Sequence, residues 1–331
     1  MSSERQSNES ADVLATLIRA GGRREAPPEE AYRIVLAAAE SALRDKLRRR
    51  RRWRVGLALA AAASVGFLSV LLYPALRQPA PQPARVATID RLDGLVAFRQ
   101  STSEDWTALD SARTVLKQGA QLRTGQKSGA GLIFHEQVSV RLSADSAIEL
   151  TDLSEIRLQH GTIYVDTGAM SSQPIEVVTP MGIAHHQGTQ FELRYLPPTL
   201  QLRVREGRVV VDRASGEVLA EAGEGVIITA AGEVTRTAIA SHDPAWQWSE
   251  ALAPMPAFDG QSASVLLEWV ARQTGRELRY VDPAAEQRAA TAILHGQVGQ
   301  LAPTEAMEVM LATTNLGFDL GRDDTILVGT R

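Results

Sequence analysis

Apolar and polar residues alternate through the middle of the chain with the period of two that is typical of β-strands. Val138, Val140 and Leu142 alternate with Ser139 and Arg141, so the apolar side chains should share one face of a strand. Further runs, each of four to six residues, contain the pairs Ile156 and Leu158, Ile163 and Val165, Ile175 and Val177, Phe191 and Leu193, Leu202 and Val204, Val209 and Val211, and Val226 and Ile228.

Glycines or polar clusters separate many of these runs, and we expect tight turns between strands at Gly161 and Gly207. The pattern predicts a mainly β domain over 86–245, built of short antiparallel strands and arranged as a sandwich, a barrel or a solenoid. No repeat of fixed length distinguishes the solenoid from the other two.

After Phe258 the spacing becomes that of helices mixed with short strands. Ser262 begins a predicted helix that Gly275 ends, and Pro303 suits the first turn of a second helix. Strands are expected at 277–281, at 292–294, and in a hairpin that pairs 317–320 with 325–328. The strand at 277–281 could be central in its sheet, with the hairpin supplying an edge. Residues 246–331 are therefore predicted to form a small α+β domain.

An apolar stretch over 55–72 contains no charged residue. As a helix it would be about 27 Å long, close to the roughly 30 Å thickness of a bilayer's hydrocarbon core. Aromatic rings at its two ends favour the membrane interface. We predict one transmembrane helix over 55–76, anchored by Arg52, Trp53, Arg54 and Tyr73. A signal peptide would have a much shorter basic region and apolar stretch, and a buried helix of a soluble protein would show a polar face.

The charge is distributed unevenly about this stretch. Residues 1–54 carry a net charge of +5 and end in an arginine cluster, whereas residues 55–331 carry a net charge of −9. Because basic residues stay on the cytoplasmic side, we expect 1–54 to be cytoplasmic and partly helical. Residues 77–85 read as a proline-rich spacer, and the domains beyond it should lie outside the cytoplasm.

Composition and motifs argue against catalysis and against direct nucleic-acid binding. The chain has no cysteine, its net charge is −4, and aromatic residues make up 5% of it. It contains no HExxH, GxSxG or phosphate-loop motif, and the adjacent His185 and His186 would point to opposite faces of a strand. We expect no enzyme activity, no cofactor and no metal site.

Six segments of the β region carry a recognisable pattern: TGQKSGAGLIF from Thr124, VSVRLSADSAIEL from Val138, IRLQHGTIYVD from Ile156, PIEVVTPMG from Pro174, QGTQFELRY from Gln187 and VREGRVVV from Val204. Together they resemble the FecR family of transmembrane regulators of the iron-dicitrate sensor type. The family residues Gly161, Gly188, Thr189, Phe191 and Gly207 are expected to be structural. Residues 246–331 resemble the short N-terminal domain of secretins and TonB-dependent transporters, through ARQTGRELRY and PTEAMEVMLATTNL.

The resemblance implies a single-pass protein of the bacterial inner membrane, with its N-terminus in the cytoplasm and its C-terminal domains in the periplasm. Its implied partners are an extracytoplasmic-function sigma factor inside and the signalling domain of a TonB-dependent transporter outside. The outer partner is expected at the C-terminal hairpin, through Gly317, Phe318, Ile326, Leu327 and Val328.

A second interpretation is a membrane-anchored periplasmic binding or scaffold module that has no transcriptional role. The family's cytoplasmic domain usually carries tryptophan anchors, whereas Trp53 is the only tryptophan that precedes the apolar stretch here.

Overall fold

This computed structural model describes residues 84–134, 138–168, 175–296, 301–321 and 324–331, together with Thr16, 19–21, 29–30, Arg33 and Gly299. The chain divides into two compact units, Met1–Pro81 and Gln82–Arg331. The predicted membrane helix and its anchors Arg52, Trp53, Arg54 and Tyr73 lie outside the described residues. In the part that is described, no helix has the length and apolar character needed to span a bilayer.

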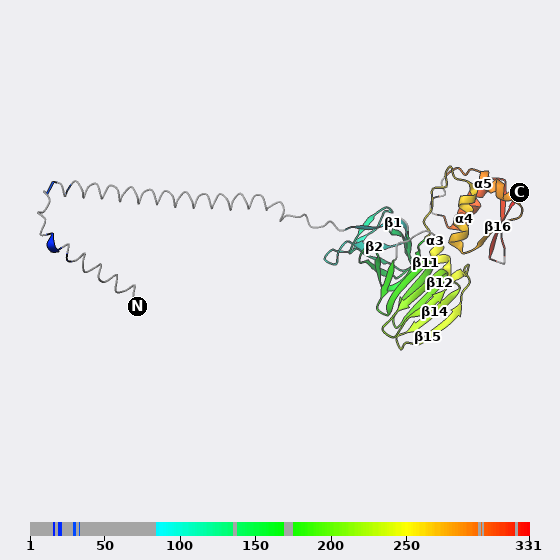
Figure 1. Cartoon of the computed structure of the whole chain (residues 1–331). Helices are drawn as coiled ribbons and strands as arrows, with labels where there is room; N and C mark the ends of the chain where they lie inside the picture. The colour runs from blue at the N-terminus through cyan, green and yellow to red at the C-terminus, as the bar shows by residue number, and fades with distance from the viewer. Residues whose placement is uncertain are drawn as a thin grey trace. The chain divides into compact units, whose positions relative to one another are not determined.

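Among the described residues, the second unit contains a 15-stranded sheet, in which the strands β11, β12, β14 and β15 lie side by side (Figure 1). Its strands are β1 (Arg85–Asp93), β2 (Val96–Arg99), β3 (Thr107–Ala108), β4 (Val115–Lys117), β5 (Gln121–Thr124), β6 (Gly129–Phe134), β7 (Val138–Leu142), β8 (Ala147–Leu150), β9 (Glu155–Asp166), β10 (Glu176–Thr179), β11 (Gly182–Leu196), β12 (Thr199–Asp212), β13 (Val218–Glu221), β14 (Glu224–Thr229) and β15 (Val234–Ala238).

The main path of hydrogen-bonded strands runs β15-β14-β12-β11-β10-β9-β7-β6-β1-β4. Its neighbours are antiparallel except β9 and β10, which run parallel. The mainly β architecture predicted from the sequence is confirmed. The expectation that every strand is short is wrong, because β9, β11 and β12 are 12, 15 and 14 residues long.

The long strands explain the two glycines that were expected in turns. Gly161 lies inside β9 with φ of 93°, and Gly207 lies inside β12 with φ of 79°. Neither ends a strand. The pairing register with β11 shifts at Gly207, between Gln187 and Gln190, and the register with β8 shifts two residues before Gly161, between Ala147 and Ile148. These glycines therefore allow irregularities within continuous strands, where an L-residue would be strained.

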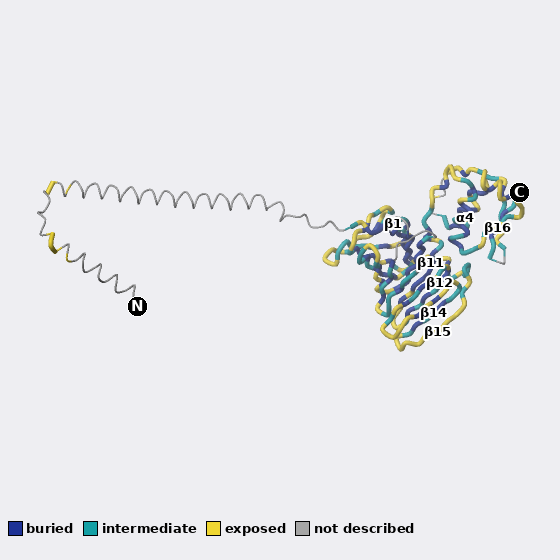
Figure 2. Tube along the Cα trace, viewed as in Figure 1, coloured by how far each residue is buried: buried dark blue, intermediate teal, exposed yellow. Residues whose placement is uncertain are grey.

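The core of the sheet is made of rows of side chains that cross several strands. One row runs from Val140 on β7 through Val165 on β9 and Phe191 on β11 to Val204 on β12. All four are almost completely buried, so the predicted phase of these strands is confirmed. In Figure 2 the interior of these strands is correspondingly dark blue.

The remaining elements follow the sheet in sequence. They are the 3-10 helix η1 (Pro244–Trp246), α3 (Gln247–Ala251), α4 (Ala263–Thr274), β16 (Glu277–Tyr280), α5 (Pro283–Thr291), α6 (Pro303–Leu311), β17 (Leu316–Leu320) and β18 (Thr325–Thr330). The small C-terminal α+β region is confirmed, with Gly275 ending α4 in the left-handed conformation and Pro303 opening α6.

Three details of this region differ from the prediction. The helix α5 was not expected, and residue 293 forms only an isolated bridge with Ser262 rather than a strand. Within the described residues, the C-terminal sheet has the order β16-β18-β17. The strand at 277–280 is therefore an edge strand and not a central one, whereas β18 of the hairpin is central.

Candidate functional site

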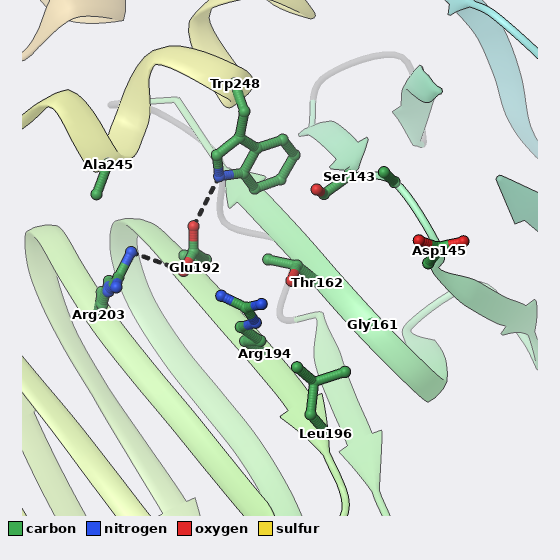
Figure 3. Close-up of a pocket in the computed structure, with 11 residues that line it drawn as sticks. Ser143, Asp145, Gly161, Thr162, Glu192, Arg194, Leu196, Arg203, Ala245 and Trp248 are labelled. Carbon is green, nitrogen blue, oxygen red and sulfur yellow. Dashed lines mark hydrogen bonds and ion pairs between the residues drawn. The ribbon is translucent and has the colours of Figure 1, made fainter. Parts of the chain in front are cut away.

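A pocket of about 570 Å³ lies between the central strands of the sheet and the segment formed by η1 and α3 (Figure 3). Strands β9, β11 and β12 contribute Thr162, Glu192, Arg194 and Arg203, and α3 contributes Trp248. Ser143 and Asp145 add a side wall from the turn between β7 and β8. The pocket thus combines an aromatic ring, hydroxyl groups and charges of both signs.

One face of β11 lines this pocket from its buried end to its exposed end. Glu192, Arg194 and Leu196 are two residues apart and so share one face of the strand. Glu192 is 2% exposed and Leu196 is 41% exposed, with Arg194 exposed between them. The pocket therefore opens to solvent at Leu196 and is closed at Glu192.

The buried carboxylate of Glu192 is held by two partners. The indole Nε1–H of Trp248 donates to Glu192 Oε2 at 2.8 Å, and Arg203 Nη1 lies 3.3 Å from Oε1. Burial raises the pKa of Glu192, and the Trp248 hydrogen bond and the charge of Arg203 oppose that rise. Glu192 consequently fixes both the tryptophan and the arginine in place.

Arg194 differs from Arg203 in having no such partner. Within the described residues its guanidinium makes no hydrogen bond or ion pair, and it projects into the pocket in Figure 3. The positive charge of Arg194 also acts on Glu192 from a distance, and it opposes the rise in the pKa of Glu192 that burial causes. Arg194 thus leaves donor groups available inside the pocket.

A second polar cluster fastens the segments after the sheet to the sheet itself. We call Arg141, Asp166, Arg205 and Arg272 the arginine junction. Arg141 is fully buried and donates to the Ser249 carbonyl at 2.8 Å and to Gln273 Oε1 at 2.6 Å. The alternation along β7 predicted that Arg141 lies on a polar face of the strand, but that face is covered by α3 and α4.

Arg205 uses its donors in the same way. Its guanidinium donates to the carbonyls of Ser241 at 2.6 Å and Gln273 at 2.7 Å, and to the Glu250 carboxylate at 2.7 Å. Its planar group also lies 5.0 Å from the ring centre of Trp246. These contacts bind the ends of α3 and α4 to the middle of β12.

The carboxylate of Asp166 balances the charge of this junction. Arg272 Nη2 lies 2.6 Å from Asp166 Oδ1, and Arg141 Nη2 lies 3.8 Å from Oδ2. Burial alone would raise the pKa of Asp166, but the charges of Arg141 and Arg272 bring it below its ordinary value. Asp166 therefore remains ionised and neutralises part of the buried positive charge.

The residues that carry the family resemblance lie in the sheet. A Cβ at Gly161 would collide with Ser146, and Gly188 has φ of 58° beside the register shift of β11. Thr189 and Phe191 are fully buried, and the N–H of Thr189 donates to Thr167 Oγ1 at 3.0 Å. The pocket incorporates Gly161, which forms part of its lining.

The residues expected to bind an outer partner are not presented on one surface. Ile326 and Val328 are fully buried in the core of the C-terminal α+β region. Gly317 and Phe318 lie on the edge strand β17, whereas Leu327 is 39% exposed on the central strand β18. An outer partner at this hairpin stays a prediction, and only β17 offers it a strand edge.

Sequence reasoning missed the pocket because its chemistry comes from distant segments. Glu192 and Arg194 alternate with core residues, which is the usual pattern of a solvated strand face, and Trp248 follows the sheet by many residues. A signal was nevertheless present, since a tryptophan in a polar segment and charged residues on neighbouring long strands each needed a partner.

The two adjacent histidines form no metal site with other residues that the structure describes. His185 Nδ1 lies 3.3 Å from Glu176 Oε1, while His186 Nε2 accepts a hydrogen bond from the Ile175 N–H at 3.2 Å. Burial lowers the pKa of His186 to about 4, with a smaller contribution from His185. His186 is thus a neutral acceptor in the sheet.

Two crystal structures of a candidate anti-sigma factor from Parabacteroides distasonis ATCC 8503 resemble the chain at 14% identity and a TM-score of 0.35. Each covers 64% of this chain and 98% or 99% of its own, and a likeness at this level carries no functional argument. No curated protein matches the sequence. Residues 120–210, which include the pocket residues on β9, β11 and β12, match the family described as FecR protein.

Proposed function

We propose that the protein is a signal transducer whose outer domains receive an envelope signal and whose N-terminal segment regulates a sigma factor. The observation that carries this proposal is the FecR match over 120–210, which coincides with the central strands of the sheet. The proposed role needs binding surfaces and not catalytic groups, so we propose no enzyme activity. An anti-sigma role and a supporting role toward the sigma factor both fit it.

The proposed arrangement is a single pass through the bacterial inner membrane. It rests on the uncharged stretch over 55–72 and on the arginines that precede it. Residues 1–54 would then contact the sigma factor in the cytoplasm, and the unit Gln82–Arg331 would lie in the periplasm. The proline-rich residues 77–85 would separate that unit from the bilayer.

The proposed outer partner is the signalling domain of a TonB-dependent transporter, which links the signal to iron uptake. The C-terminal sheet supports this partner because, within the described residues, β16 and β17 each have one side without a neighbouring strand. An added strand from a partner could pair with such an edge through backbone hydrogen bonds.

A scaffold with no transcriptional role is the second candidate, favoured by the single tryptophan, Trp53, within residues 1–54. Copurification separates the two candidates. The full chain and a variant lacking 1–50 would each be expressed with affinity tags, and the sigma factors bound to each would be quantified. Sigma factor on the full chain alone supports the transducer, whereas none on either chain supports the scaffold.

A further inference from the structure

We propose that the pocket beside Trp248 binds a small molecule that carries one carboxylate and a planar apolar group. The carboxylate would pair with the Arg194 guanidinium, and the apolar group would contact the indole of Trp248 and the side chain of Leu196. The pocket's volume of about 570 Å³ falls in the range of small-molecule sites.

The distribution of charge selects a carboxylate as the anionic group. Arg203 is already paired with Glu192, because its Nη1 lies 3.3 Å from Glu192 Oε1. Among the described lining residues, Arg194 is therefore the guanidinium available to bind a ligand. A carboxylate matches the two parallel donors of one guanidinium. A dianionic phosphate would instead face Glu192 and Asp145 with only one arginine to balance its charge.

The geometry also accounts for the apolar part of the ligand. The Nε1–H of Trp248 is taken by Glu192 at 2.8 Å, so the indole offers the ligand only its carbon surface. Because that hydrogen bond fixes the ring before any ligand enters, binding needs little side-chain ordering. Leu196, which is 41% exposed at the open end, extends the apolar surface toward solvent.

The test uses the full chain and two probes, N-acetyl-phenylalanine and indole-3-acetate, with binding followed by ligand-observed NMR. The amide of each probe keeps the ring and removes the negative charge. Arg194→Gln removes the proposed anion site, and Arg157→Gln changes an exposed arginine on β9 outside the pocket. Thermal unfolding of each variant checks that it remains folded.

We expect at least one acid to bind the wild type at least tenfold more tightly than its amide. Its affinity should fall at least tenfold in Arg194→Gln and change less than twofold in Arg157→Gln. The proposal is overturned if neither acid binds, if acid and amide bind equally, or if Arg194→Gln binds as well as the wild type. A longer peptide that ends in phenylalanine is measured beside the two probes. Binding of that peptide alone would also overturn the proposal, because the ligand would then be a protein partner.

Discussion

Arg141 Nη2 donates to Gln273 Oε1 at 2.6 Å and so joins β7 to the last turn of α4, 132 residues later in the chain. Neither side chain could form this contact in an isolated sheet or an isolated helical unit. The contact therefore forms only when the large sheet and the α+β region are attached to each other.

Removing Arg141 should destabilise the second unit strongly. Arg141→Met leaves Gln273, the Ser249 carbonyl and part of the Asp166 charge buried without their partner, and breaking a buried pair costs about 3–5 kcal/mol. Urea unfolding would measure the loss. Arg157→Gln, an exposed change, should shift the free energy of unfolding by less than about 0.5 kcal/mol. If Arg141→Met and the wild type had equal free energies of unfolding, the arginine junction would contribute nothing to stability.

Phe191→Ala should destabilise the sheet by about 3–5 kcal/mol, because the substitution opens a cavity in a fully buried row. Leu219→Ala is a suitable control, since Leu219 is 42% exposed on β13. Chemical unfolding of both variants gives the comparison. A Phe191→Ala protein as stable as the control would mean that β11 packs in the opposite phase.

The stability of the protein should depend on pH through His186. Its pKa is lowered to about 4 in the folded state, so the unfolded chain binds a proton that the folded chain does not between about pH 6.5 and 4. Stability contributed by neutral His186 is therefore lost as pH falls through this window. In His186→Gln, the difference between the urea unfolding midpoints at pH 7 and pH 5 should be smaller than in the wild type. If the difference is unchanged, other groups cause the pH dependence.

The proposed topology predicts the activity of reporter fusions. Alkaline phosphatase fused after Ala84 should be active, because that reporter needs export from the cytoplasm and the arginine cluster keeps 1–54 inside. A cytoplasmic reporter fused at the same position should be inactive. The reverse pattern of activities would reject the proposed orientation.

The edge strand β17 can be tested with a single proline. Gly321 N–H donates to the Thr325 carbonyl, and alternation along an antiparallel ladder turns the N–H of Leu320 away from β18. Leu320→Pro should keep the hairpin folded but weaken binding of the transporter's signalling domain at least fivefold, as measured by calorimetry. Unchanged affinity in the folded variant would exclude this edge.

Proline at Leu327 or Ile326 would be a poor probe of the same surface. Both residues lie on β18, which has a neighbouring strand on each side. A proline there removes a ladder hydrogen bond whichever way the N–H points. Loss of binding in such a variant would therefore report unfolding of the C-terminal sheet, so Leu327→Pro serves as the unfolded reference.

The alternation of apolar residues was enough to predict the β domain and the burial of Phe191 and Val204, because one-sided burial imposes a period of two. The same rule failed at Arg141, since α3 and α4 cover the second face of its strand. Pattern alone also could not distinguish a turn glycine from the irregularities at Gly161 and Gly207. To predict the pocket, one would need to know which distant segment packs over Glu192. Only the tertiary structure supplies that information.

Three buried arginines of the sheet, Arg91 on β1, Arg141 on β7 and Arg205 on β12, donate to backbone carbonyls of the segments that follow the sheet. Arg205 binds the carbonyls of Ser241 and Gln273, Arg141 binds that of Ser249, and Arg91 binds those of Ala251 and Ala253. Every residue type has a carbonyl, so most substitutions in this segment would leave the same acceptors in place. Apart from Gln273 and Glu250, whose side chains also accept from these arginines, the segment that follows the sheet can vary in sequence while its attachment persists, and the evolutionary constraint falls on the three arginines.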